Sequence, residues 1–96
     1  MVAPSDAKNL LARLDRIAEL LLSPEIPGQM HHAEAVAISI CQSAPNGVIA
    51  EIALQLVAAL GAIGRFPDEP AYMVTLDTAL RRLREALLAA AHHKGE

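Results

Sequence analysis

The sequence predicts an all-α protein, an up-down-up-down four-helix bundle that pairs into a homodimer. In four segments apolar residues recur at intervals of three and four, the period of an amphipathic helix, and proline and glycine separate these segments. Of the 96 residues 53% are hydrophobic, but only Phe66 and Tyr72 are aromatic, so the core must be aliphatic. This composition favours close helix packing over a sheet. The length fits a single domain, residues 1–96.

The first two helices are expected at 5–22 and 28–43. Ser5 or Asp6 can cap the first helix by accepting hydrogen bonds from its leading N–H groups, and the SPEIPG segment ends it. Its apolar stripe consists of Leu10, Leu14, Ile17 and Leu21, widened by Leu11, Ala18 and Leu22. The apolar face of the second helix consists of Met30, Ala33, Val36, Ala37, Ile40 and Ala44, with His31, Glu34 and Gln42 opposite.

The third helix is expected at 46–63, with Asn46 as its N-cap and Gly61 or Gly64 at its end. Its central stripe consists of Ile49, Ile52, Leu56, Leu60 and Ile63, flanked by Ala53 and Val57. Because this apolar arc is broad, we expect the third helix to pack against both the second and the fourth.

The fourth helix is expected at 68–93, with Asp68 as its cap and Pro70 in its first turn. Its apolar positions alternate three and four residues apart over more than two heptads and are Met73, Leu76, Leu80, Leu83, Leu87 and Ala90. Such spacing is typical of helices that pack nearly antiparallel with a left-handed twist. The short connections between all four helices likewise predict antiparallel neighbours.

The stretch EIALQLVAALGAIG, residues 51–64, contains only two polar residues, Glu51 and Gln55. A membrane span is disfavoured for it, because an acidic residue inside a span is costly. It can instead be a central helix of the monomer, or a helix that also pairs with a second chain. The predicted interface is the stripe away from the core, Glu51, Gln55, Ala58 and Ala62. Other apolar residues also point outward, namely Ile38, Val74 and Leu88, so a monomer would expose an unusually large apolar surface and we expect a homodimer.

Nucleic acid is disfavoured as the main partner because the net charge is −3 and the basic residues are scattered or paired with acids. The one basic cluster is RRLRE, which contains Arg81, Arg82 and Arg84. Asp77, Arg81 and Glu85 are spaced four residues apart and form a ladder that neutralises much of this charge. A DNA-associated regulator that uses these three arginines in a dimer remains an alternative hypothesis.

Two histidine pairs, His31-His32 and His92-His93, suggest metal binding as a further alternative, in a His/Glu metal-binding or sensory bundle. Adjacent histidines point about 100° apart on a helix, and the two pairs belong to opposite ends of the predicted bundle. Cys41 could join the second pair, although a small apolar role at the core margin suits it better. We therefore expect no metal or other cofactor.

No catalytic triad, phosphate-binding loop or zinc-ligand spacing occurs in the sequence, so we expect no enzyme. The single cysteine and the absence of a secretory signal at the N-terminus favour the cytoplasm. The predicted function is a homodimeric protein–protein interaction or regulatory module, adaptor-like, with an unidentified protein partner and no membrane contact.

Overall fold

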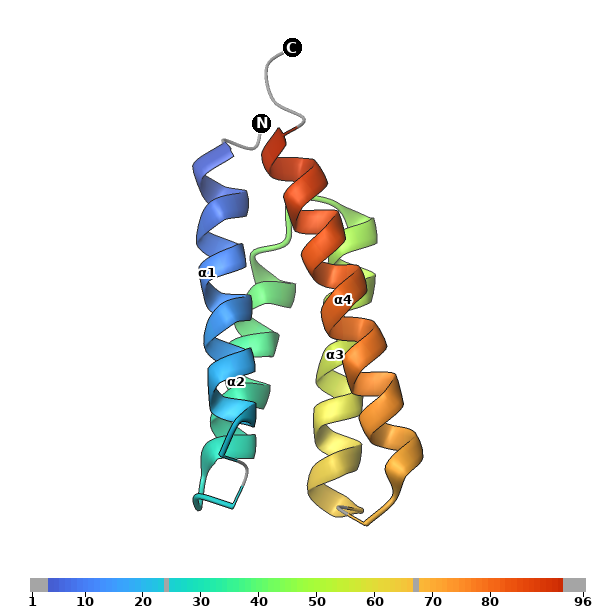
Figure 1. The fold of residues 1–96 in the computed structure, drawn as a ribbon. Coiled ribbons are helices and arrows are strands. Elements are labelled where there is room, and N and C mark those ends of the chain that lie inside the picture. The colour runs from blue at the N-terminus through green and yellow to red at the C-terminus, as the bar shows by residue number, and fades with distance from the viewer. Residues whose placement is uncertain (1–3, 24, 67, 93–96) are drawn as a thin grey trace.

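The computed structural model describes residues 4–23, 25–66 and 68–92, and the all-α prediction is confirmed. The described residues form four helices, α1 (Pro4–Leu21), α2 (Gln29–Gln42), α3 (Gly47–Arg65) and α4 (Pro70–His92). Each helix packs against its neighbours along the chain, and α1 also packs against α4. The chain runs up and down in turn, so that α1 begins and α4 ends at the same end of the bundle (Figure 1).

The core of the bundle is aliphatic, as the composition predicts, and all four helices contribute to it. Among the described residues it contains no buried polar or charged side chain. The large side chains that are almost fully buried are Leu10, Leu14, Ile17, Leu20, Ile40, Ile49, Leu56, Leu60, Leu83 and Leu87. Burial of each such side chain contributes about 1.5–3 kcal/mol relative to leaving it in water, so this layer holds the helices together.

The ends of α1 differ from the prediction. The helix begins at Pro4, so Ser5 and Asp6 lie within its first turn and not at its N-cap. It ends at Leu21, and the next residue enters a turn in which the Leu22 N–H donates to the Glu19 carbonyl. Leu22, predicted on the apolar stripe, is therefore 82% exposed, and the core position is taken instead by Leu20.

The beginning of α3 follows the prediction and its end does not. Asn46 is the N-cap, with its side-chain Oδ1 accepting a hydrogen bond of 2.9 Å from the Ile49 N–H. The helix continues through Gly61 and Gly64 to Arg65, and neither glycine takes the left-handed conformation. The helix ends before Pro67, since the residue that precedes a proline is disfavoured in the helical region.

The starts of α2 and α4 are also shifted. Gly28 is the N-cap of α2 and not its first residue, and its φ of 86° lies in the left-handed region that glycine adopts without strain. α4 begins at Pro70, as the fixed φ of proline favours, so Asp68 lies two residues before the helix and is not its cap. Met73, predicted in the core seam, is 52% exposed and lines a pocket at this end of the bundle. The predicted last residue of this helix, His93, lies outside the described residues.

Candidate functional site

The predicted interface residues lie together on the outer side of α3. The core stripe of this helix is buried as predicted, which turns the opposite side to solvent. Glu51, Gln55 and Ala58 are exposed and Ala62 is half-buried. The structure thus brings the four residues onto one accessible face, as their spacing indicates.

One large apolar side chain that the sequence analysis did not single out widens this face: Leu54 is 60% exposed. Val48 is 64% exposed but lies toward α4, where it lines a surface pocket with Ala86, Ala89 and Ala90. Leu54 lies one helical turn from both Glu51 and Ala58 and therefore shares their side of the helix. Its spacing from those two residues was the available signal, but a leucine in such an apolar helix is first assigned to the core.

Helix α2 extends the exposed face of α3. The Cys41 Sγ is 3.6 Å from the Ala50 carbonyl oxygen, and a Cβ added at Gly61 would lie 3.3 Å from the Glu34 Oε2. In an antiparallel pair these two contacts join positions whose numbers add to 91 and 95, so Ile38 and Leu54, whose numbers add to 92, lie at about the same level. Ile38 is 42% exposed. Outward residues of the two helices form one surface, called here the α2–α3 face: Ala35, Ile38, Gln42, Glu51, Leu54, Gln55, Ala58, Ala62 and Arg65.

The outer side of α4 carries charges instead. The Arg81 and Asp77 side chains form an ion pair of 2.8 Å along the helix. Arg84 forms an ion pair of 2.7 Å with Asp15, which crosses from α4 to α1. Two of the three arginines considered for DNA binding are thus paired with carboxylates, while Arg82 is exposed. The DNA hypothesis itself stays a prediction.

The histidines are not gathered into a metal site in the described part of the chain, where no three His, Cys, Asp or Glu residues are grouped for one ion. His31 and His32 are exposed in the first turn of α2. The side chain of His92 and the whole of His93 lie outside what the structure describes. Cys41 is half-buried against the core margin, the small apolar role expected of it.

By length and composition alone, α3 is a helix that could cross a membrane. The central helix of a bundle passes the same test, and here α3 packs against both α2 and α4. Seven of its residues are buried, which are Ile49, Ile52, Ala53, Leu56, Ala59, Leu60 and Ile63. The apolar character of α3 is therefore shared between a covered side and an uncovered one.

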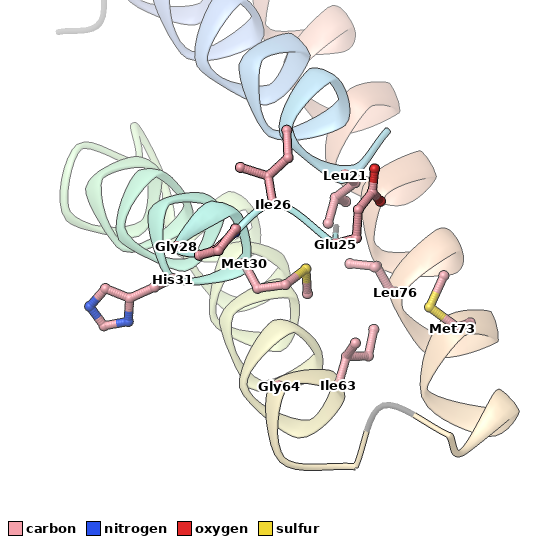
Figure 2. A pocket seen from close by; sticks show the side chains of 11 residues that line it. Leu21, Glu25, Ile26, Gly28, Met30, His31, Ile63, Gly64, Met73 and Leu76 are labelled. Carbon is pink, nitrogen blue, oxygen red and sulfur yellow. The ribbon is translucent and has the colours of Figure 1, made fainter. Parts of the chain in front are cut away.

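A pocket of about 450 Å³ lies at the end of the bundle where α1 meets α2 and α3 meets α4. All four helices contribute apolar side chains to it, including Leu21, Met30, Ile63 and Met73 (Figure 2). Its polar lining residues are Glu25 and His31, and the imidazole ring of His31 points away from the other labelled side chains. The volume is in the range of small-molecule pockets and exceeds that of a single large side chain.

Comparison with protein-family models, curated proteins and solved structures finds no match.

Proposed function

We propose that this protein is a non-catalytic, homodimeric interaction module in which two copies pair through the α2–α3 face. One observation carries the proposal: Leu54 and Ile38 are exposed at the same level of neighbouring helices, with alanines around them. Contiguous exposed apolar surface of this kind marks interaction sites in soluble proteins. Small residues between the larger ones allow the backbone of another helix to approach closely.

The outer side of α4 suits solvent better than an interface. Its ion pairs, Asp77 with Arg81 and Asp15 with Arg84, would have to be stripped of water on pairing. Removing charges from water costs more than exposed pairs contribute. Val74 and Leu88 are exposed on this helix, but charged residues lie between them. We therefore place α2, and not α4, beside α3 in the dimer interface.

The adaptor role needs a second surface, and the pocket at the loop end is our candidate. It lies at one end of the bundle, whereas the α2–α3 face runs along its side, so a dimer leaves the pocket open. Ile26 and Met73 are exposed at the pocket and about half of each side chain is accessible. Methionine adapts its shape to different partners, which suits a pocket for an apolar side chain of a partner protein.

The homodimer is tested by light scattering coupled to size exclusion at tens of micromolar. We expect the mass of a dimer for the wild type and of a monomer for Ala58→Arg, because a large charged side chain would enter the centre of the interface. Ala12→Arg is the matched control, since Ala12 is an exposed alanine on α1, the helix that does not contact α3. It should leave the dimer intact. A monomeric wild type would refute the proposal, and a dimeric Ala58→Arg would place the interface elsewhere.

The pocket is tested with a matched pair of glycine substitutions in α3. A Cβ added at Gly64, which lines the pocket, or at Gly47, which does not, meets no atom within 4 Å. We expect the neutral dye Nile red to gain fluorescence with the wild type and with Gly47→Leu. Gly64→Leu should reduce that gain because its side chain occupies part of the pocket. Equal fluorescence with both variants would show that the dye binds elsewhere and would remove the support for this pocket.

A further inference from the structure

The outer side of α3 carries one acidic and one basic residue in a symmetric arrangement. Glu51 lies seven residues before Ala58, and Arg65 lies seven residues after it. Seven residues are nearly two helical turns, so all three positions lie along one line on the outer side of the helix. Glu51, Ala58 and Arg65 are all exposed, and Arg65 is the last residue of the helix.

Neither Glu51 nor Arg65 forms an ion pair within the described part of the chain. Its three ion pairs join Arg16 with Glu19, Arg81 with Asp77 and Arg84 with Asp15. Glu51 and Arg65 lie 14 residues apart on one helix, about 21 Å at 1.5 Å per residue, so they cannot reach each other. A pair between them has to form between two chains.

We propose that α3 pairs antiparallel with α3 of a second copy about a two-fold axis at Ala58, so that Glu51 forms an ion pair with Arg65 of the partner subunit. This inference rests on the homodimer proposed above and specifies its register. In an antiparallel pair centred on residue 58, each position lies opposite the one whose number adds with it to 116. The sum of 51 and 65 is 116, and two-fold symmetry makes the same pair twice.

The same register matches side-chain sizes. Leu54 comes opposite the partner's Ala62, and Ala58 meets its own copy on the axis. The largest apolar side chain of the stripe therefore faces a small one, which lets the two helices approach as interdigitating surfaces require.

Helix α2 is compatible with this axis. The contacts between α2 and α3 described above place Ala35 at about the level of Ala58, because 35 and 58 add to 93, between the sum of 91 for Cys41 with Ala50 and the sum of 95 for Glu34 with Gly61. A small exposed residue thus lies near the axis on α2 as well. The two-fold axis lies in the interface and is perpendicular to the helices, so α2 faces α2 of the partner subunit. The two α2 helices therefore need to approach closely, which a small residue near the axis allows.

A parallel pairing of the two α3 helices is less favourable. It would place every residue of the stripe beside its own copy, so Glu51 would face the partner's Glu51. Like charges directly opposed across an interface disfavour association. Sliding the antiparallel pair by a helical turn would likewise separate Glu51 from the partner's Arg65. Charge and size select the same register.

The register is tested by exchanging the two charges, with dimer dissociation measured by sedimentation equilibrium at low salt. Glu51→Arg and Arg65→Glu should each weaken the dimer at least tenfold, because each variant opposes like charges twice. The double variant should recover the wild-type dissociation constant to within about threefold. Both side chains are exposed, and circular dichroism checks that the helical content is unchanged.

Mixing the two single variants gives a test that only pairing between chains can pass. In the mixture, an acidic protomer can join a basic one so that both symmetry-related contacts are attractive. We expect a heterodimer, identified by an affinity tag on one variant, at concentrations at which each variant alone is monomeric. Glu85→Arg, a charge reversal at an exposed position on α4, is the control and should leave the wild-type dimer intact.

The outcomes separate the register from the homodimer itself. If the wild type is a monomer, the homodimer fails and the register fails with it. If the wild type is a dimer that neither single variant weakens, the homodimer stands and the register is wrong. If the double variant and the mixture remain as weak as the single variants, the two charges do not meet, and the register is again wrong.

Discussion

The outer sides of α3 and α4 differ, although the two helices are antiparallel neighbours and bury similar aliphatic stripes. On α4 the outer positions carry acids and bases paired along the helix and across to α1. On α3 they carry Leu54, alanines, Gln55 and two charged residues, Glu51 and Arg65, that form no ion pair within the described part of the chain. A surface helix normally presents charged residues to water. Burial toward the core therefore does not distinguish a solvent-facing helix from the helix that we propose to pair with a second chain, whereas the outer side does.

The largest expected effect concerns the core-facing sides of α3 and α4, which are alike. Leu56 on α3 and Leu83 on α4 are both 0% exposed. Replacing either with alanine should lower the free energy of unfolding by about 2–5 kcal/mol, through lost burial and the cavity that remains. Denaturant titration of each variant measures this. A loss below 1 kcal/mol for only one of them would mean that the two helices are not equivalent toward the core.

The next effect distinguishes the outer side of α3 from the outer side of α4. Leu54 on α3 and Val74 on α4 are exposed to a similar degree, 60% and 67%. Leu54→Ala should weaken self-association by about 1–2 kcal/mol, because the dimer loses apolar burial from two copies of this side chain, whereas Val74→Ala should not change it. Sedimentation equilibrium gives both dissociation constants. If the two substitutions have equal effects, the difference between the outer sides has no functional meaning.

The sequence predicts features of this bundle that depend on neighbouring residues. The apolar period gives four helices, and Asn46 caps α3 because its side chain needs only the nearby Ile49 N–H. Features that depend on three-dimensional packing are predicted less well. Leu22 follows the helical period but leaves the helix, and Met73 follows the seam but borders a pocket. Glycine can end a helix, but it does not do so at Gly64, where α3 continues for another residue.

In the candidate interface, too, local features are predicted better than features that depend on three-dimensional packing. Periodicity places Glu51, Gln55 and Ala58 on one side, but it does not identify the exposed Leu54 as part of that side. Ile38 and Leu54 lie at about the same height along their helices because of the register between α2 and α3. That register comes from two contacts between different helices, which no local pattern contains.

A smaller effect is expected at the charged side of α4. Asp77 and Arg81 form an ion pair with side chains that are largely exposed, at 73% and 66%. Asp77→Ala should therefore lower the stability by only about 0.3–0.5 kcal/mol, because water screens an exposed pair at this spacing. Thermal unfolding at low and high salt checks this, and the difference should shrink at high salt. A loss above 1 kcal/mol would indicate that the pair belongs to a larger network.

The smallest effect is expected in the binding of nucleic acid, a measurement that tests whether the outer side of α4 has a function. Arg82 is exposed, but Arg81 and Arg84 are paired with carboxylates, and the net charge of the chain is −3. Duplex DNA should bind no more tightly than the usual non-specific range of about 10⁻⁴–10⁻⁶ M, without sequence preference and less strongly as salt increases. Gel-shift titrations with several unrelated duplexes measure this, with Arg82→Ala as the comparison variant. Nanomolar, sequence-selective binding that Arg82→Ala abolishes would make α4 a functional surface and would remove the contrast between the two helices.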